Sequence, residues 1–193
     1  MQEDEYHGDG LNLYAYCANN PVGYYDPSGY CVADKDTYKK LGYTEEEAAA
    51  ILSGRYATGI ENKVRVVEKE KLPSNIVVTF KDGIYRTVET KEDITVYRVY
   101  GGSAMRDGSF TTSNPAINRL DVKQRLALKT EWGNTMEYEV KINIPAGTKI
   151  NIGIAEKQIS KIDGELCGGG DQILLAKDWP ADEWIVGERE LLK

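Results

Sequence analysis

The sequence predicts an α+β protein whose core is mainly antiparallel β-sheet, with one or two short helices. Two observations predict this class. Apolar and polar residues alternate over 94–100, 136–144 and 149–155, which is the period of strands that bury one face. Turn residues, namely Gly101-Gly102 and Pro145-Ala146-Gly147, end the first two of these runs. Helical patterns are fewer and shorter than the strand patterns.

Two helix starts can be identified. Thr44-Glu45-Glu46-Glu47 has the spacing of a capping box, in which the threonine hydroxyl and the last glutamate each accept a hydrogen bond from a backbone N–H of the first turn. The helix that follows is short and ends near Gly54. Asn118 is the second candidate N-cap, and it predicts a helix over 119–129. The residues expected to point inward from this helix are Val122, Leu126 and Ala127.

Further strands are predicted on either side of the central runs. Asn75–Phe80 and Ile84–Val88 are rich in β-forming residues and are separated by Lys81-Asp82-Gly83. Because Asp-Gly favours the tight turns that join antiparallel strands, this stretch predicts a β-hairpin. Near the C-terminus, Gly168-Gly169-Gly170 indicates a loop that leads into a strand at Gln172–Leu175.

The charge distribution separates the two halves of the chain. The 193 residues carry a formal net charge of −7. Residues 1–93 hold 11 basic and 17 acidic residues, whereas residues 94–193 hold 13 and 14. The second half is nearly neutral and has no basic stripe, which argues against a nucleic-acid-binding surface. Apolar runs are only a few residues long, so no membrane segment is expected. The acidic start lacks the pattern of a signal peptide, so export would depend on a larger protein.

Histidine and cysteine usage restrict the possible chemistry. The only histidine is His7, so the rest of the chain has none for paired-histidine ribonuclease, Ser-His-Asp or Cys-His catalysis. The three cysteines, Cys17, Cys31 and Cys167, form no C-x-x-C pair. We therefore expect no metal site. Cys17 and Cys31 could pair, but the odd count is not typical of a disulfide framework, and we interpret all three cysteines as free.

One stretch carries a family resemblance. Leu11–Tyr30 reads LNLYAYCANNPVGYYDPSGY and contains N-x-Y-x-Y-x-x-N-N-P followed by D-P-x-G. This run resembles the end of the conserved core of RHS-repeat (YD-repeat) proteins, in which Asp26 matches the Asp-Pro-x-Gly position and the following residues form a variable C-terminal payload, usually a toxin. The resemblance implies an RHS core remnant over 1–30, a connector with a short helix and a β-hairpin over 31–90, and a toxin payload over 91–193.

The same resemblance implies a biological setting. The chain would belong to a larger secreted or cell-surface RHS protein, and its payload would act in the cytoplasm of a competing cell. A cognate immunity protein that plugs the active cleft would protect the producing cell.

Without histidine, the payload must work with arginine, carboxylates, hydroxyls and amides. Three segments stand out: a strand that places Arg98 before a Gly-Gly turn, the small-residue run Gly108–Thr112, and the triple glycine before Asp171-Gln172. An arginine fork matches a pyrophosphate, and glycine loops let backbone N–H groups approach an anion. Cleavage of the nicotinamide–ribose bond of NAD suits such groups. Its leaving group is a neutral pyridine, so orientation and charge stabilisation suffice without a general acid.

The order of these segments is similar to that in the tuberculosis necrotizing toxin family, NAD glycohydrolases with an ADP-ribosyltransferase-like core. That resemblance implies an ADP-ribosyltransferase-like fold, Gln172 as the catalytic amide, and Arg98 or Arg106 as the arginine that serves NAD. Glu131 or Glu165 would fill the role that a catalytic glutamate has in diphtheria-like and cholera-like transferases. This chain departs from the family by inserting Ile159–Leu166 and by lacking its histidine. The residues expected to contact NAD are Arg98, Tyr100, Gly101, Gly102, Ser109, Phe110, Thr111 and Gly170.

Several alternatives remain open from the sequence. The payload would either hydrolyse NAD or transfer ADP-ribose to a protein or RNA target. A histidine-free ribonuclease is a second hypothesis, because RHS payloads include many nucleases. A non-enzymatic binding module that uses tyrosines as its contact surface is a third.

Overall fold

The structure is a computed structural model that describes residues 34–191. The RHS-like run, with Asp26, Cys17 and Cys31, lies outside the described residues. The chain divides into two compact units, one up to Arg55 and one from Tyr56 onward. None of the described helices is long and apolar enough to cross a membrane.

The described part of the first unit is a pair of short helices, α1 (Lys35–Lys40) and α2 (Glu45–Leu52). The capping box predicted for α2 is confirmed. The Glu47 N–H donates to the Thr44 hydroxyl at 3.2 Å, and the Thr44 N–H donates to the Glu47 carboxylate at 2.9 Å. Helix α2 buries Ala48, Ala50 and Ile51 and ends at Leu52 with Ser53 as its C-cap, close to the predicted end near Gly54.

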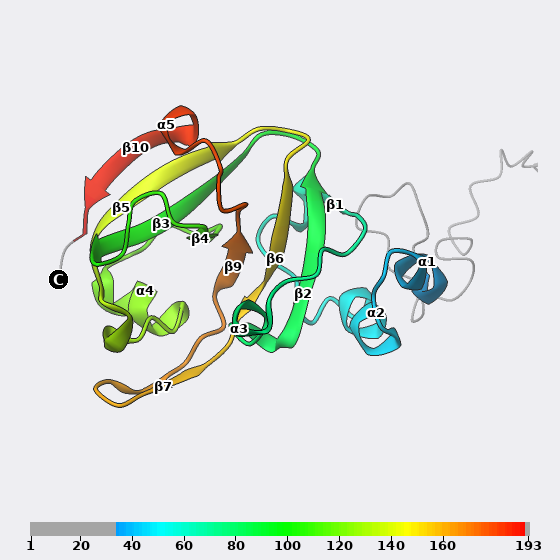
Figure 1. Cartoon of the computed structure of the whole chain (residues 1–193), viewed down its shortest axis with the longest axis horizontal. Coiled ribbons are helices and arrows are strands. Elements are labelled where there is room, and N and C mark those ends of the chain that lie inside the picture. Colours follow the sequence, from blue (N-terminus) through cyan, green and yellow to red (C-terminus); the bar gives the residue numbers. More distant parts are fainter. Residues whose placement is uncertain (1–33, 192–193) are drawn as a thin grey trace, which may run out of the picture. The chain divides into compact units, whose positions relative to one another are not determined.

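The second unit contains three antiparallel sheets (Figure 1). The α+β class with mainly antiparallel strands and short helices is therefore confirmed. A five-stranded sheet has the order β1 (Val64–Val66), β2 (Phe80–Thr90), β6 (Lys149–Ala155), β9 (Asp171–Leu174) and β4 (Phe110–Thr111). A three-stranded sheet has the order β10 (Ile185–Glu190), β5 (Asn134–Ile144) and β3 (Ile94–Gly102). A two-stranded hairpin joins β7 (Gln158–Ser160) to β8 (Gly164–Leu166). The helical elements are α3 (Ser74–Val77), α4 (Arg119–Arg125), α5 (Ala181–Trp184) and the 3-10 turns η2 (Glu61–Lys63) and η3 (Thr130–Trp132).

The boundary of the second unit differs from the predicted one. We expected a connector up to residue 90, but the compact unit begins at Tyr56. The reason is strand pairing: β2 lies between β1 and β6 in the five-stranded sheet, with Val88 opposite Ile150. Residues 64–90 are therefore part of the folded core and do not lead up to it.

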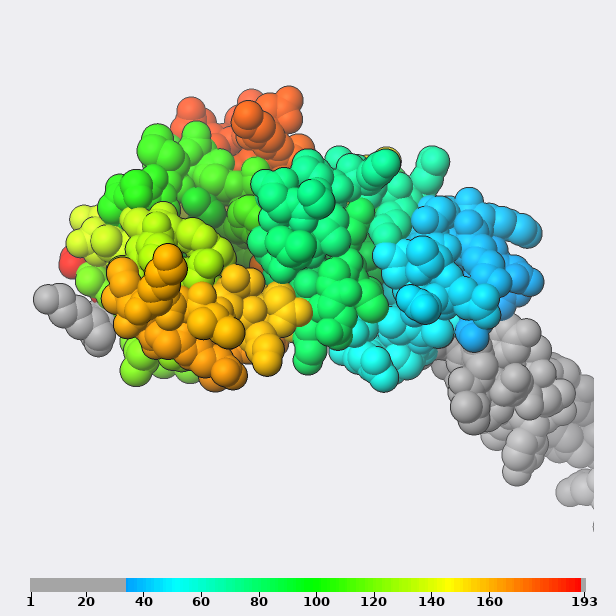
Figure 2. Space-filling view, turned by 60° about the horizontal axis from the view of Figure 1, so that its bottom comes forward, coloured from blue at the N-terminus to red at the C-terminus, as the bar shows by residue number. Residues whose placement is uncertain are grey.

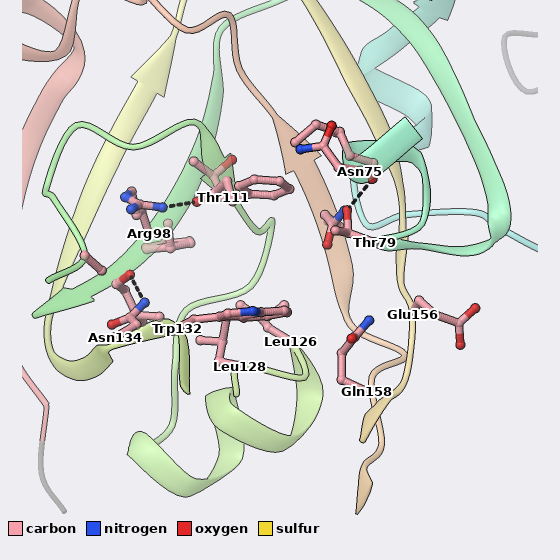
Figure 3. A pocket seen from close by; sticks show the side chains of 16 residues that line it. Asn75, Thr79, Arg98, Thr111, Leu126, Leu128, Trp132, Asn134, Glu156 and Gln158 are labelled. Carbon is pink, nitrogen blue, oxygen red and sulfur yellow. Dashed lines mark hydrogen bonds between the residues drawn. The ribbon is translucent and has the colours of Figure 1, made fainter. Parts of the chain in front are cut away.

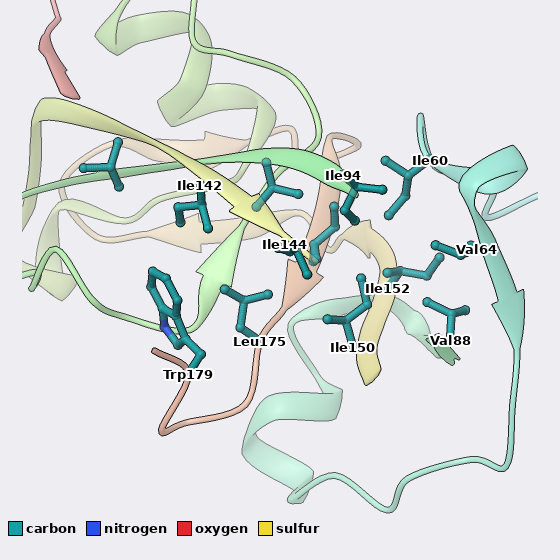
Figure 4. Packing of buried hydrophobic residues seen from close by; sticks show 13 residues of the cluster. Ile60, Val64, Val88, Ile94, Ile142, Ile144, Ile150, Ile152, Leu175 and Trp179 are labelled. Carbon is teal, nitrogen blue, oxygen red and sulfur yellow. The ribbon is translucent and has the colours of Figure 1, made fainter. Parts of the chain in front are cut away.

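The core lies between the two larger sheets (Figure 4). The alternation predicted for β5 places Val140, Ile142 and Ile144 inside, each fully buried. Tyr138 departs from this pattern because it is 40% exposed and packs on Tyr100, with 5.4 Å between the ring centroids. Other members of the cluster come from β2, β3, β6, β9 and the segment after β9, namely Val88, Ile94, Val96, Ile150, Ile152, Ile173, Leu175 and Trp179.

The predicted β-hairpin at Asp82-Gly83 is wrong. Ser74–Val77 forms helix α3, and β2 continues through Asp82-Gly83 as one strand. Asp82 and Gly83 do adopt left-handed φ angles of 57° and 70°, the conformation that Asp-Gly favours. Here that conformation makes an irregularity in the pairing of β2 with β6, between Phe80 and Tyr85.

Helix α4 begins at its predicted N-cap but is shorter than expected. The Asn118 side chain accepts from the Asp121 N–H at 2.8 Å, and Val122 is fully buried. The helix stops at Arg125, since the buried Ala127 takes a left-handed φ of 50°. The chain then enters the 3-10 turn η3, which exposes Trp132 on the surface. The early end of α4 therefore determines where Trp132 lies.

Candidate functional site

A pocket of about 390 Å³ opens where the two larger sheets come together (Figure 3). The junction is an antiparallel bridge: the backbone groups of Tyr97 and Thr112 exchange two hydrogen bonds of 2.8 Å. As a result, the residues of β3 and β4 that flank this bridge lie beside each other. The lining residues are Asn75, Ile76, Thr79, Tyr97, Arg98, Val99, Ala104, Phe110, Thr111, Leu126, Leu128, Trp132, Asn134, Glu156, Gln158 and Gln172.

The lining is largely apolar and carries little net charge. Phe110 and Trp132 are 37% and 47% exposed, so two aromatic rings remain accessible to a ligand. In Figure 3, Trp132 lies with Leu126 and Leu128 on the side opposite Asn75 and Thr79. The lining includes one guanidinium and one carboxylate. Apolar and aromatic walls with a few polar groups suit a flat heteroaromatic ligand.

The Gln172 amide has a fixed orientation in the pocket. Its amide nitrogen donates to the Thr79 hydroxyl at 2.7 Å, and that hydroxyl donates its own proton to the Ile76 carbonyl at 2.7 Å. Because Thr79 has a single hydroxyl proton, it can only accept from Gln172, which fixes the amide orientation. The Gln172 side-chain oxygen has no hydrogen bond from the described residues, although the residue is only 8% exposed. An oriented acceptor therefore remains available in the pocket.

Arg98 contributes a positive charge to the pocket, and its guanidinium group holds the loop from 103 to 110 in place. Its Nε and Nη2 donate to the Met105 carbonyl at 3.0 and 2.8 Å, and its Nη1 donates to the Phe110 carbonyl at 2.8 Å. No carboxylate of the described residues lies within ion-pair distance of it. Burial lowers the pKa of Arg98 to about 10, while the nearby charge of Asp107 opposes this change. The guanidinium stays charged at neutral pH and sets the position of Phe110.

Gly108 is required by this arrangement. A Cβ at residue 108 would collide with the guanidinium of Arg98. The loop from 103 to 110 therefore wraps closely around the arginine because residue 108 has no side chain.

The wall that carries Trp132 is fastened to the β7–β8 hairpin. The Asp163 carboxylate accepts from the Lys123 ammonium at 2.6 Å and from the Thr130 N–H at 2.9 Å. The Glu131 carboxylate accepts from the Lys161 N–H at 2.6 Å and from the Ser160 hydroxyl at 2.8 Å. We call these contacts the hairpin clamp. Figure 2 shows the hairpin (orange) beside the segment of α4 (lime green) on one face.

The clamp depends on ionised carboxylates. The Lys123 hydrogen bond, followed by that of the Thr130 N–H, holds the pKa of Asp163 well below its usual value. The Glu131 backbone N–H and then the Ser160 hydroxyl lower the pKa of the Glu131 carboxylate. Both side chains are therefore charged at neutral pH, and they hold the turn that carries Trp132.

Four residues named from the sequence line the pocket together: Arg98, Phe110, Thr111 and Gln172. Glu131 does not line it, because its carboxylate holds the hairpin turn. Glu165 is exposed on β8 and Arg106 pairs with Asp182 at 3.0 Å, so neither lines it.

The other residues expected to contact NAD do not line the pocket and form contacts elsewhere in the protein. Tyr100 donates to Glu188, and burial, with this hydrogen bond, raises the pKa of Tyr100 to about 12. Gly101 and Gly102 form a tight turn against residues 133–137. The Gly170 N–H donates to the Arg125 carbonyl at 2.9 Å. Ser109 lines a neighbouring groove.

Sequence reasoning missed Trp132, Glu156, Gln158, Asn75 and Asn134 as lining residues. Glu156 is the carboxylate of the lining, and it accepts from the backbone N–H groups of Asp82 and of Lys157, each at 2.9 Å. Its neighbour in the lining, Gln158, comes from the inserted hairpin. The only signal in the sequence that pointed toward this wall was Glu131, the neighbour of Trp132, because the other residues belong to no motif.

Among the described residues, no group of three or more His, Cys, Asp or Glu side chains is placed to hold a metal ion. Cys167 is free and exposed. Comparison with models of protein families, with curated proteins and with solved structures finds no match to this chain.

Proposed function

We propose that this chain is the tip of an RHS-type toxin with an ADP-ribosyltransferase-like fold, and that the pocket cleaves the nicotinamide–ribose bond of NAD. One observation carries the proposal. Arg98 and Gln172, which were selected from the sequence for NAD chemistry, line the same pocket with Phe110 and Thr111. Had the two side chains lain on opposite faces, the hypothesis would have failed.

The reaction needs few protein groups. The bond between the ribose anomeric carbon and the nicotinamide nitrogen breaks, and its electron pair stays on the nitrogen, so nicotinamide leaves as a neutral pyridine. Positive charge then develops on the ribose as an oxocarbenium-like centre. In hydrolysis, a water oxygen bonds to that carbon and loses a proton, which gives ADP-ribose. In transfer, a target nucleophile takes the place of water.

Gln172 is assigned to the ribose. Its side-chain oxygen is an oriented acceptor with no partner in the described part of the chain, so it can hold a ribose hydroxyl and face the developing positive charge. The exposed rings of Phe110 and Trp132 offer apolar surface for nicotinamide. The proton of the attacking water or nucleophile passes to solvent, because both oxygens of Glu156, the carboxylate of the lining, accept from the backbone N–H groups of Asp82 and Lys157.

Arg98 has two roles in this proposal. Its hydrogen bonds to carbonyls fix the loop that carries Phe110. Its charge, which forms no ion pair with a carboxylate of residues 34–191, favours an anionic substrate such as the NAD diphosphate. Arg98 is therefore a positioning residue with an added electrostatic contribution.

The decisive experiment is nicotinamide release from NAD by the purified chain, followed by chromatography. We expect release without any added protein for a glycohydrolase, and release with labelling of a protein or RNA in cell extract for a transferase. Gln172→Ala should lower the rate by about 100-fold or more. The control Glu165→Gln, on an exposed residue outside the pocket, should leave it unchanged. Equal rates in the two variants, or no NAD loss in either assay, would contradict the proposal.

The toxin role is tested in cells. Expression of residues 56–193 in a bacterial cytoplasm should deplete NAD and stop growth, and Gln172→Ala should restore both. A cognate immunity protein should bind the pocket face and block the reaction in the purified system. Growth arrest with unchanged NAD would support the ribonuclease hypothesis in its place.

A further inference from the structure

A second, larger groove adjoins the pocket. It has a volume of about 750 Å³ and lies over the ends of β6 and β9 that are farthest from Gln172. We call it the lysine groove. Its lining consists of Glu68, Lys69, Glu70, Leu72, Pro73, Ile76, Ser109, Phe110, Lys149, Asn151, Leu174, Leu175, Ala176 and Lys177.

The lysine groove and the pocket share two walls. Phe110 and Ile76 line both spaces. Phe110 is 37% exposed, so its ring is a ridge with a ligand space on each side. A ligand long enough to pass this ridge would have one end near Gln172 and the other in the groove. The pocket alone, at about 390 Å³, is at the small end of the usual range for ligand sites.

The charges of the lysine groove are suited to phosphate. Lys149 begins β6 and Lys177 follows β9, and these two strands pair antiparallel, so both lysines lie at the same end of the pair. Both side chains are exposed, and neither forms an ion pair within the described residues. The ammonium of Lys69 lies over the Tyr85 ring, 4.6 Å from its centroid. Three ammonium groups and two carboxylates, those of Glu68 and Glu70, line the groove, which leaves it one net positive charge in a protein whose net charge is −7.

The remaining walls are suited to a nucleoside. Leu72, Pro73 and Leu174 give the groove an apolar side. Asn151 is satisfied, since it donates to Glu70 at 2.8 Å and accepts from Thr87 at 2.7 Å. A planar base can therefore pack on apolar surface while charged phosphates meet the lysines.

From this arrangement we propose that the lysine groove binds the adenosine diphosphate half of NAD, with the dinucleotide passing over Phe110 to place its nicotinamide end beside Gln172. The inference rests on the proposed function for the choice of dinucleotide. It adds Lys149 and Lys177 as phosphate-binding residues. It also gives Ser109 and Phe110, which the sequence suggested as NAD contacts, a position between the two halves of the ligand.

The test measures ADP-ribose binding to the purified chain by titration calorimetry, a readout that does not need turnover. The variant Lys149→Gln/Lys177→Gln should weaken ADP-ribose binding by about tenfold. The control Lys91→Gln/Lys141→Gln removes two exposed lysines outside the groove and should bind as the unaltered chain does. Unchanged ADP-ribose affinity in the groove variant would overturn the inference.

Kinetics separate the groove from the chemistry. The groove variant should raise the KM for NAD and leave kcat unchanged, whereas its cleavage of nicotinamide mononucleotide, which lacks the adenylate half, should equal that of the unaltered chain. Lysine-dependent ADP-ribose binding without any NAD cleavage would overturn the proposed reaction and leave the groove assignment standing. Tighter, lysine-dependent binding of a short RNA oligonucleotide than of ADP-ribose would overturn the groove assignment.

Discussion

Two arginines on consecutive strands of the second unit have opposite electrostatic surroundings. Arg86, on β2, is 5% exposed and forms a two-pronged ion pair with Glu61, with one contact at 2.5 Å. Arg98, on β3, donates only to the carbonyls of Met105 and Phe110. The charge of Arg86 is neutralised by an ion pair, whereas Arg98 forms no ion pair within the described residues and has only the more distant charge of Asp107 near it.

An arginine side chain therefore stabilises the fold at residue 86 and remains available to a ligand at residue 98. Burial alone raises the pKa of Glu61, but the hydrogen bonds and charge of Arg86 outweigh it and lower that pKa. Burial lowers the pKa of Arg98, and the charge of Asp107, which forms no ion pair with it, opposes this change only in part. A partly buried cation without a counterion is costly unless a ligand supplies the negative charge.

The largest effect is expected from breaking the ion pair in the core. Arg86→Met leaves the Glu61 carboxylate buried without its partner, so the free energy of unfolding should fall by about 3–5 kcal/mol in a urea titration. Adding Glu61→Leu to Arg86→Met should recover most of that loss, because the unpaired charge disappears. A double variant that is no more stable than the single one would show that the pair is not the source of the effect.

The second largest effect is expected from the substitution of Arg98. Arg98→Lys keeps a positive charge but lacks the planar fork that donates to the Met105 and Phe110 carbonyls together, so Phe110 loses one of its anchors and keeps its strand pairing with Leu174. We expect kcat/KM for NAD to fall by about 100-fold, with a loss of only about 1–3 kcal/mol in unfolding free energy. Arg106→Lys, in an exposed ion pair outside the pocket, should change neither quantity. Equal losses of activity in both variants would remove Arg98 from the site.

A smaller effect should follow from releasing Gln172. Thr79→Val removes the hydroxyl that fixes the amide orientation, so the acceptor oxygen no longer stays directed into the pocket. We expect kcat to fall by about tenfold with little change in KM. Thr79→Ser retains the hydroxyl and should retain the rate. Full activity in Thr79→Val would mean that the orientation of Gln172 is unimportant.

The smallest effect concerns the hairpin clamp in acid. The folded-state pKa values of Asp163 and Glu131 lie below their ordinary values of 3.8 and 4.5. The clamp is therefore fully stabilising above about pH 4.5 and is lost as the pH falls through the lowered folded-state values. The NMR signal of the Trp132 indole N–H should be constant above that pH and shift below it. Asp163→Asn should change this signal already at neutral pH, and an unchanged signal there would contradict the role of the clamp.

The parts predicted from the sequence were those that local chemistry determines. The capping box at Thr44 and the N-cap at Asn118 are encoded within a few residues, and the structure has both, while the alternation over 136–144 holds from Val140 to Ile144 and fails at Tyr138 and the buried Glu139. The hairpin at Asp82-Gly83 failed because a local turn preference was overruled by the long pairing of β2 with β6.

The residues of the site divide in the same way, into those that a sequence segment indicates and those that only tertiary contacts place. Gln172 and Arg98 stood in recognisable segments, and pairing across the sheets brought them to one pocket. Trp132 and Glu156 belong to no motif, and only the early end of α4 and the turn after β6 place them there. Glu131 was chosen for its chemistry, yet its carboxylate is used to hold the hairpin. Sequence spacing gives no sign of such a tertiary contact.

The measurement that tests the central claim most directly is a crystal structure of the Gln172→Ala variant soaked with NAD. We expect this variant to bind the dinucleotide and to cleave it about 100-fold more slowly than the unaltered chain. The account predicts the nicotinamide ring and its ribose in the pocket lined by Phe110, Trp132 and residue 172, with the diphosphate toward Lys149 and Lys177. NAD bound elsewhere on the protein, or an empty pocket at a saturating NAD concentration, would contradict it.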